Sequence, residues 1–463
     1  MRHCALFWFT AVFGGCILHA AELPRPVNFV VILGEGHGLS SSSVQMDDTL
    51  PGSKSTFIRS PNLEKLASGG MRFANFYAPS PRCTPSRAAI LTGKNPARLK
   101  MTFVNEGGKD SGMAVNGRVI PPTSSTELPM SETTIAELLK RAGYATAHFG
   151  KWHVGRTNPN QHGFDESDGP TNNGGPEDVE NPHPKELYGM TERGMNFMER
   201  AVKAAKPFYL QLSHYPSRGG GEAKPETIQM VKSWGGLSQR EVMEAAVNLD
   251  LDIALGMILK KLDALGITTN TYVIFTADHG NPGHNLPLTG GKGTVSEGGL
   301  RVPLIVRGPS VKPSVFSHVR ATGEDLFPTI AALAHTHEPL PKDIDGGNLL
   351  PALTNGVRGT VKRTREEFVV HFPHYDDDAR GPASAVWLGD FKLIKVYETS
   401  ALHLFNVAKD PGERNDLVRE LPDKAKELQQ RLTNYLSLMS AQVPMPNPNY
   451  DPTKPTETKR KRR

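Results

Sequence analysis

The sequence predicts an α/β protein with a large, mostly parallel mixed sheet sandwiched by helices, followed by a small C-terminal antiparallel sheet and helix. Three observations indicate this fold class. Apolar runs alternate with helical segments over most of the chain, as in parallel sheets whose strands are joined by helices. Polar residues follow several apolar runs, where open α/β sheets place their ligands. From about residue 365 the pattern changes to short strands separated by turns.

The elements of the large sheet are expected in a regular order. The continuous apolar run VNFVVILG, at 27–34, is typical of a buried parallel strand. Helices are expected to begin near Ser60 and near Ser131 with Thr134, which are capping residue types, and to end at glycine. Strands are predicted within 27–38, 71–78, 144–150, 206–216, 270–280 and 301–309, and helices within 60–70, 131–143 and 240–267.

Composition sets the domain boundaries. Residues 1–21 have a basic start, an apolar stretch of about fifteen residues and small residues at the end, which is the layout of a secretory signal peptide. This stretch is too short to span a membrane. The catalytic α/β domain is expected over 22–360, the antiparallel subdomain over 361–440 and a flexible basic tail over 441–463. We therefore expect a periplasmic or extracellular protein with no stable membrane insertion.

Cysteine usage excludes a disulfide framework. Cys4 and Cys16 lie in the predicted signal peptide, so its cleavage leaves Cys83 as the one cysteine of the mature chain. Lipid attachment at Cys16 is a weaker alternative, because Phe13-Gly14-Gly15 is a poor match to the usual small aliphatic pattern.

Charge excludes nucleic acid as a partner. The formal net charge is +5, and Lys459-Arg460-Lys461-Arg462-Arg463 alone carries five positive charges, so the body of the protein is close to neutral. The tail is expected to be solvated, with weak docking to acidic polymers as the alternative.

Six polar residues fall within one or two positions of the carboxyl ends of predicted strands. Because these ends meet at one edge of a parallel sheet, we expect the six side chains in one crevice. Singly, each would more often be solvated or hydrogen-bonded structure. Together, carboxylates and imidazoles can hold a divalent cation, and histidines can move protons. The six are Glu35, Lys151, His153, His214, Asp278 and His279. With Lys151, the cations Arg87 and Lys292 can surround an anion.

Cys83 fits this crevice poorly as an ordinary thiol. Arg82 and Arg87 flank it, and positive charge lowers the pKa of a thiol and makes it reactive. In an oxidising compartment such a thiol would be open to oxidation unless it were modified. A buried structural cysteine is the alternative.

The segment CTPSRAAILTG, at 83–93, resembles the signature of the sulfatase family, Cys-X-Pro-Ser-Arg-X-X-X-Leu-Thr-Gly. In that family a dedicated enzyme oxidises the cysteine to formylglycine. The resemblance covers about residues 25 to 420 and includes GKWH at 150–153, FTADHG at 275–280, GGKGTVSEGGLRVPLIVRGP at 290–309, DLFPTIAAL at 325–333 and matching segments within 388–417. It implies an alkaline-phosphatase-like fold, a formylglycine-generating enzyme as partner and hydrolysis of sulfate esters.

The resemblance also implies roles for the anion-binding and nucleophilic residues. Cys83, as the hydrated aldehyde, would attack the sulfur of a sulfate ester with one hydroxyl, and the second hydroxyl would then expel sulfate and regenerate the aldehyde. Arg87 would orient that diol and balance charge at the metal. Lys151 and Lys292 would bind sulfate oxygens and stabilise the leaving oxygen.

The remaining roles concern protons and the metal. His153 would accept a proton from the second hydroxyl, and His214 would donate one to the leaving alcohol. The implied ligands of a single Ca²⁺ are Glu35, Cys83, Asp278 and His279. Because a histidine nitrogen is an unusual ligand for Ca²⁺, His279 leaves room for a different ion.

The chain departs from the family after the first strand. Most members carry two adjacent aspartates there, whereas this chain has Glu35 and Gly36, and glycine offers no ligand. We hypothesise that Asp48 or Asp47 completes the metal site, with His37 as another candidate. The alternative is a degenerate site that has lost its metal.

The sequence thus predicts an exported sulfatase that acts on sulfated carbohydrates. Phosphoester or phosphonate hydrolysis and glycan binding without turnover are the alternatives. In the C-terminal subdomain, His371, His374 and Asp376–Asp378 are candidates to reach the substrate, and a solvated loop is the alternative reading of this segment. The insert at 102–129 is expected to shape the rim of the cleft.

Overall fold

The computed structural model describes residues 26–104, 112–175, 185–215, 223–283, 285–356 and 359–458. The predicted signal peptide, with Cys4 and Cys16, and the basic residues 459–463 lie outside the described residues. Among the described helices, none combines the length and the apolar character needed to cross a membrane.

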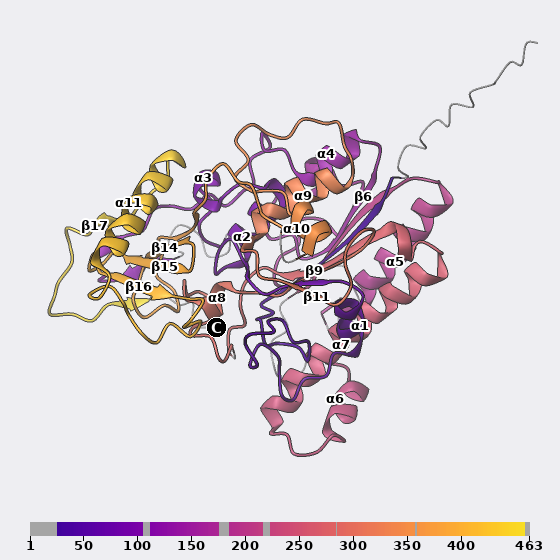
Figure 1. Cartoon of the computed structure of the whole chain (residues 1–463), viewed down its shortest axis with the longest axis horizontal. Coiled ribbons are helices and arrows are strands. Elements are labelled where there is room, and N and C mark those ends of the chain that lie inside the picture. The colour runs from indigo at the N-terminus through magenta and orange to yellow at the C-terminus, as the bar shows by residue number, and fades with distance from the viewer. Residues whose placement is uncertain are drawn as a thin grey trace, which may run out of the picture.

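The core of the fold is an eight-stranded mixed sheet (Figure 1). Its strands, in spatial order, are β11 (Val315–Ser317), β2 (Met71–Phe73), β10 (Leu304–Arg307), β9 (Thr271–Ala277), β1 (Asn28–Gly34), β8 (Phe208–Ser213), β6 (Ala145–Gly150) and β7 (Glu166–Ser167). The central strands β9, β1, β8 and β6 are parallel, and β10 is antiparallel to β9. The carboxyl ends of four neighbouring strands therefore meet at one edge, which confirms the predicted fold class.

Helices cover both faces of this sheet because its central strands bury side chains on both sides. In β1, Phe29, Val31 and Leu33 pack into one apolar cluster, and Val30 and Ile32 pack into another. This alternation explains why the strand reads as an unbroken apolar run. One face carries α2 (Cys83–Thr92), α4 (Ile135–Arg141) and α9 (Leu326–Leu333), and the other carries α1 (Pro61–Ser68), α5 (Leu187–Lys203) and α7 (Gln239–Ala264).

Only some of the residues predicted to cap helices do so. Of the two residues predicted near the start of α4, Thr134 is the N-cap and forms a capping box with Glu137, whereas Ser131 lies three residues before it. Ser60 precedes α1 as predicted, but its side chain makes no capping hydrogen bond. The long α7 helix has Ser238 as its N-cap, which forms a capping box with Glu241.

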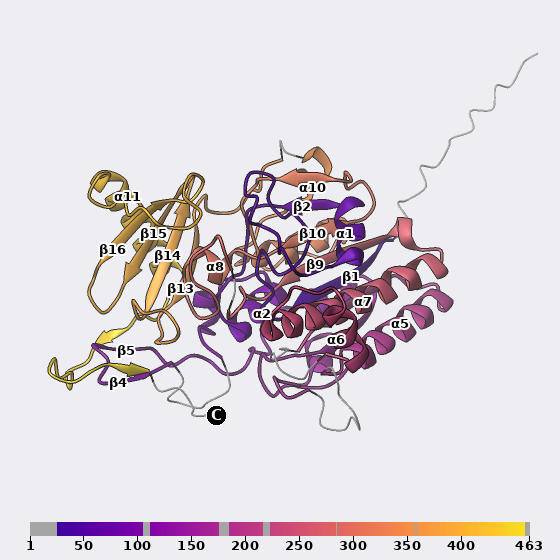
Figure 2. The same cartoon turned by 90° about the horizontal axis from the view of Figure 1, so that it is seen from below.

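The C-terminal subdomain is an antiparallel sheet with one helix, as predicted. Its strands are β13 (Phe368–Phe372), β14 (Ala383–Leu388), β15 (Phe391–Val396) and β16 (Leu402–Asn406), and α11 (Pro422–Leu438) packs on them. The opposite face of the sheet packs against the large domain through Trp387, Tyr77 and Leu300. In Figures 1 and 2 this gold subdomain lies at the opposite end of the molecule from α5 and α7.

Part of the predicted flexible tail pairs with the insert at 102–129. β17 (Met445–Pro446) is antiparallel to β5 (Val119–Ile120), and β18 (Glu457–Thr458) is antiparallel to β4 (Ala114–Val115) (Figure 2). Two-residue strands leave no periodic pattern, which is why the sequence did not predict them. The remaining elements are β3 (Phe76–Tyr77), β12 (Ala321–Thr322), α3 (Pro96–Leu99), α6 (Pro225–Lys232), α8 (Glu297–Leu300), α10 (Leu350–Asn355) and the 3₁₀ turns η2 (Pro159–His162), η3 (Thr268–Asn270) and η4 (Gly323–Asp325).

Candidate active site

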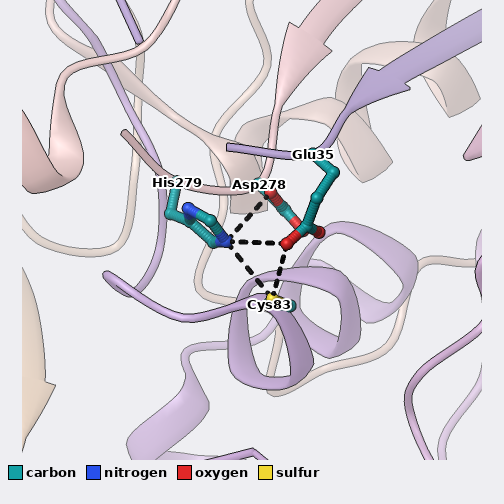
Figure 3. Close-up of side chains that lie close together, drawn as sticks. All are labelled: Glu35, Cys83, Asp278 and His279. Atoms are coloured by element: carbon teal, nitrogen blue, oxygen red, sulfur yellow. Dashed lines mark hydrogen bonds and ion pairs between the residues drawn. The ribbon is translucent and has the colours of Figure 1, made fainter. Parts of the chain in front are cut away.

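Four of the predicted residues form one buried cluster at the carboxyl edge of the sheet: Glu35, Cys83, Asp278 and His279 (Figure 3). Each offers one ligand atom, and these four atoms lie within 4.8 Å of one another. The Cys83 Sγ is 3.1 Å from Glu35 Oε1 and 3.2 Å from His279 Nε2. His279 Nε2 is in turn 3.4 Å from Asp278 Oδ1.

The parallel pairing of two strands brings these groups together. Gly34, the last residue of β1, lies opposite Ala277, the last residue of β9. The residues that follow, Glu35 and Asp278, must therefore leave the sheet side by side. Cys83 is the first residue of α2, so the amino end of that helix completes the cluster from the third side.

Three cations surround the carboxylates of the cluster. Arg87 donates from Nε to Asp278 Oδ2 at 3.0 Å and from Nη2 to Glu35 Oε2 at 3.2 Å. Lys151 Nζ lies 2.8 Å from Glu35 Oε2, and Lys292 Nζ lies 2.9 Å from Glu35 Oε1 and 3.6 Å from Cys83 Sγ. The predicted anion-binding cations thus converge on one point.

Burial and charge perturb the ionisation of the cluster. Burial raises the pKa of Glu35, but Lys151 and Lys292 outweigh burial and hold it well below its usual range. Burial and the neighbouring Glu35 raise the pKa of Asp278 to about 6. Burial lowers the pKa of His279, yet Asp278 and its other anionic neighbours raise it overall to about 9. For the Cys83 thiol, burial and Glu35 raise the pKa, and the lysines bring it well below its ordinary value.

The donor set fits a divalent cation. Carboxylate oxygens and an imidazole nitrogen are donor types that bind divalent cations in proteins, and here their ligand atoms lie within 4.8 Å of one another. The Nδ1 of His279 lies 2.9 Å from the carbonyl oxygen of Gly280, an arrangement that directs Nε2 at the cluster. The site therefore has two carboxylates, one imidazole and the side chain of residue 83 as candidate ligands.

The structure does not bring Asp47 or Asp48 to this cluster, contrary to our hypothesis. Asp47 Oδ2 accepts a hydrogen bond from Arg301 at 2.5 Å, and Asp48 Oδ1 lies 2.8 Å from His318 Nε2. These interactions hold both aspartates away from the four-residue cluster. The third candidate, His37, is buried edge-on against Phe275 and is also separate from the cluster.

His214 and His153 follow the ends of the neighbouring parallel strands β8 and β6. His214 follows β8, and its carbonyl oxygen lies 3.5 Å from Arg87 Nη2. Burial, followed by the positive charges nearby, lowers the pKa of His214 to about 3. His153, after β6, is buried with a positive φ of 56°, and its amide donates to the carbonyl of Thr171 at 2.9 Å.

The two candidate histidines of the C-terminal subdomain are buried and form hydrogen bonds within the protein. His374 is buried, with Nε2 2.8 Å from Thr102 Oγ1 and its ring against Phe103. His371 is buried between Ser384 Oγ and the carbonyl of Gln442.

Asp376 binds both Nε and Nη2 of Arg82, the residue directly before Cys83. The sequence analysis missed this pair, because its partners are 294 residues apart and no local pattern links them.

A cavity of about 800 Å³ opens beside the cluster. Glu35, His214 and Lys292 line it together with residues of the first turns of α7. None of the described residues of the C-terminal subdomain, His374 included, lines this cavity.

The fold and the cluster define an α/β protein with a buried group of candidate metal ligands at the carboxyl edge of its sheet, and comparisons with known proteins identify the family. The Sulfatase family model matches residues 27–336, and the N-sulphoglucosamine sulphohydrolase C-terminal model matches residues 291–442. The chain belongs to the sulfatase family, and it is a sulfuric ester hydrolase.

Individual relatives agree with this assignment. Human arylsulfatase A is 32% identical over 83% of this chain and 83% of its own length. Steryl-sulfatase of Mus musculus is 29% identical over 88% of this chain and 81% of its own length. Among solved structures, Ps i-CgsB in complex with k-i-k-neocarrahexaose has a TM-score of 0.72, with 22% identity over 89% of this chain and 93% of its own.

Proposed function

We propose that this protein is an exported sulfatase that hydrolyses sulfate esters of carbohydrates, with residue 83 in the formylglycine form and one divalent metal, Ca²⁺ or a similar ion. The observation that carries the proposal is the position of Cys83. Its Sγ lies within 3.2 Å of both Glu35 Oε1 and His279 Nε2, at the centre of the polar cluster. A formylglycine hydrate here would supply a hydroxyl nucleophile, and a bound cation would lower the pKa of that hydroxyl.

The residues around position 83 suit the binding of a sulfate group. Lys151 and Lys292 would contact the sulfate oxygens, because their ammonium groups flank residue 83 and are buried or nearly so. Arg87 would hold the hydroxyls of residue 83 in place, since two carboxylates and the Lys151 carbonyl already fix its guanidinium. Glu35, Asp278 and His279 would hold the metal with residue 83.

Two histidines would carry out the proton transfers. His214 is neutral at pH 7 in the ligand-free protein because burial depresses its pKa to about 3. A bound sulfate ester carries negative charge, which raises the pKa of a neighbouring imidazole, so His214 would become a proton donor for the leaving alcohol only when substrate is present. His153 would accept the proton that leaves residue 83 when sulfate is expelled.

Two comparisons support carbohydrate as the substrate class. One matching family model is named for N-sulphoglucosamine sulphohydrolase, and the similar structure Ps i-CgsB was solved with a bound neocarrahexaose. Export is supported by the layout of residues 1–21, and a formylglycine-generating enzyme would be the partner that modifies Cys83.

The test combines mass spectrometry with turnover. The peptide that contains residue 83, from protein purified out of its native compartment, should carry formylglycine. The same preparation should release sulfate from 4-nitrophenyl sulfate faster than phosphate from 4-nitrophenyl phosphate, and Cys83→Ala should abolish release. An unmodified thiol in a fully active enzyme, or faster phosphate release, would overturn the proposal. The matched control is Lys260→Ala, an exposed change on α7.

A further inference from the structure

The segment that carries Lys292 is held by the C-terminal subdomain. This segment, residues 289–300, lies between β9 and β10 and ends with the short helix α8. Three of the hydrogen bonds join Asp378 Oδ2 to the amide of Val295 (3.3 Å), Arg380 Nη2 to Ser296 Oγ (2.7 Å) and the carbonyl oxygen of Gly412 to Thr289 Oγ1 (2.5 Å). The subdomain therefore contacts the segment along its whole length.

A buried carboxylate, that of Glu297 at the start of α8, is the centre of these contacts. Its Oε2 accepts a hydrogen bond from Tyr77 Oη at 2.8 Å. Its Oε1 accepts from Trp387 Nε1 at 3.2 Å and from Lys392 Nζ at 3.1 Å. Lys392 Nζ also lies 2.7 Å from Glu413 Oε1, and Glu413 Oε2 accepts from the amide of Glu297 at 2.8 Å. The carboxylate is thus bonded from both domains.

The ion pair between Glu297 and Lys392 is fully buried, since both side chains are 0% exposed. A buried ion pair is weak evidence for stability, because apolar residues of similar volume often replace it without loss. Its directional bonds do fix one relative position of the groups that they join. Here they fix the start of α8 relative to β15.

The α8 helix in turn holds the backbone beside His279. The amide of Gly280 donates to the carbonyl oxygen of Gly299 at 2.9 Å. A Cβ built on residue 280 would lie 1.8 Å from the carbonyl oxygen of Gly298, so the two backbones are in direct contact. The carbonyl oxygen of Gly280 lies 2.9 Å from His279 Nδ1. A displacement of α8 must therefore move Gly280 and turn the imidazole of His279.

The position of Lys292 depends on the same helix. The amide of Gly298, in α8, donates to the carbonyl oxygen of Thr289 at 2.8 Å and closes the loop that contains Lys292. The amide of Gly293 donates to the carbonyl oxygen of Pro81 at 2.9 Å, just before the start of α2. Movement of α8 would therefore also shift the ammonium group of Lys292 relative to residue 83.

We propose that Glu297 and Lys392 are positioning residues for the sulfatase reaction. Neither lines the cavity or belongs to the four-residue cluster. They act through α8, which sets the places of His279 and Lys292. The C-terminal subdomain is then needed for turnover because it holds α8, although none of its described residues lines the cavity. This inference rests on the roles proposed for His279 and Lys292.

The test variants are Glu297→Gln and Lys392→Met, which each remove one charge at nearly constant size. Lys395→Met is the matched control, because alternation along β15 places this half-buried lysine on the opposite face of the sheet. Leu428→Ala controls for stability, since it leaves a cavity under α11, on the side of the subdomain away from α8. If Lys392→Met does not fold, Glu297→Gln decides, because glutamine keeps an oxygen acceptor for Lys392.

The first measurement is calorimetry of Ca²⁺ binding to the full-length, metal-stripped enzyme. Glu297→Gln and Lys392→Met should bind Ca²⁺ about tenfold more weakly than the wild type, as expected when a group that orients a metal ligand is lost. Both controls should stay within about twofold of the wild type. An unchanged affinity in the test variants, or an equal loss in Leu428→Ala, would overturn the inference.

The second measurement is turnover of 4-nitrophenyl sulfate, with kcat divided by the fraction of residue 83 in the formylglycine form. The Ca²⁺ concentration that gives half-maximal activity should rise about tenfold in the test variants. At saturating Ca²⁺, kcat should still be about tenfold or more below that of the wild type, because Lys292 is displaced as well. A kcat that falls no further than in Leu428→Ala would assign the ion pair a structural role alone.

Crystal structures of the variants separate failure of this inference from failure of the proposed function. If the wild type neither releases sulfate nor binds Ca²⁺, the proposed function fails. The positioning role then stands if Gly280 and His279 are displaced by about 1 Å in Lys392→Met and not in Lys395→Met. If the wild type is active and these residues superpose in both variants, the positioning role fails alone.

Discussion

Gly36 lies directly against the ring of His279. A Cβ built on residue 36 would come within 3.2 Å of His279 Cε1, and residue 36 has a positive φ of 61°. The amide of Gly36 also donates to Asp278 Oδ1 at 3.1 Å. The imidazole thus occupies the space beside residue 36. In the family motif that this chain resembles, this position carries the second aspartate. A side chain at residue 36 would therefore press against the His279 ring, which would have to shift to admit it.

Restoring the family's aspartate should therefore harm the site. We expect Gly36→Asp to lower the metal content of the protein and to reduce kcat/KM for 4-nitrophenyl sulfate at least tenfold, because a side chain at this φ is strained and crowds His279. Metal content is measured by plasma mass spectrometry. Gly389→Asp is the matched control, since Gly389 has a φ of 58° and nothing within 4 Å of its built Cβ. Higher metal content in Gly36→Asp would contradict this account.

Lys292 is expected to act on the sulfate group as well as on Glu35. Its Nζ lies 3.6 Å from the Sγ of residue 83, so its charge sits where an attacked sulfate would bind. We expect Lys292→Ala to lower kcat/KM about 100-fold or more, as loss of a buried charge-stabilising donor does in other enzymes. Steady-state kinetics with 4-nitrophenyl sulfate test this, beside Lys260→Ala. A loss of less than threefold would assign Lys292 a structural role.

Asp376 is expected to position the amino end of α2. It binds both donors of the Arg82 guanidinium, with side-chain exposures of 7% and 19% respectively. Asp376→Asn should cost about 2 kcal/mol of stability, since it removes the nearer anion of a largely buried guanidinium and leaves, among the described residues, only Asp377 Oδ2, 3.9 Å from Arg82 Nη2. It should also lower kcat, because Arg82 directly precedes residue 83. Thermal unfolding and kinetics measure the two effects. Asp390→Asn, an exposed change in the same subdomain, should do neither; equal effects from both variants would refute the positioning role.

His374 is expected to stabilise the fold without contacting substrate. Its ring packs against Phe103 and Phe372, and its Nε2 lies 2.8 Å from Thr102 Oγ1. His374→Ala should lower the unfolding temperature by several degrees, because it leaves a cavity and an unpaired hydroxyl. KM for any sugar sulfate that the wild type hydrolyses should stay within twofold. A selective rise in KM with unchanged stability would restore the reading of His374 as a substrate residue.

The sequence could predict those parts of the site that follow directly from the sheet. Glu35, Asp278 and His279 come immediately after apolar runs, and the parallel register of β1 and β9 then forces them together. Contacts between distant loops carry no such signal. Arg82 pairs with Asp376, and Arg301 pairs with Asp47, because loops that are distant in sequence pack against each other. For this reason the proposal of Asp47 or Asp48 as a metal ligand was wrong. The α7 residues that line the cavity were likewise hidden, since half-buried residues on one side of a helix resemble an ordinary amphipathic face.

Glu324 should make stability depend on pH. This carboxyl is buried and accepts hydrogen bonds from Asn95 Nδ2 and Thr322 Oγ1. Burial raises its pKa from the ordinary 4.5 to about 7. The folded state therefore holds the proton more tightly than the unfolded state. Protonated Glu324 therefore adds about 3 kcal/mol to the free energy of unfolding below about pH 4.5, and this stabilisation is lost as the pH rises toward 7.

The variant Glu324→Gln is neutral at every pH and removes this dependence. At pH 5 the variant and the wild type should have similar unfolding free energies, and at pH 8 the variant should be more stable by up to about 3 kcal/mol. Urea unfolding at the two pH values measures the difference, and Glu366→Gln at an exposed position should show none. Glu324→Gln should also leave kcat/KM unchanged, since Glu324 lies outside the catalytic cluster. A stability difference that is the same at pH 5 and pH 8 would mean that the Glu324 carboxyl does not titrate in this range.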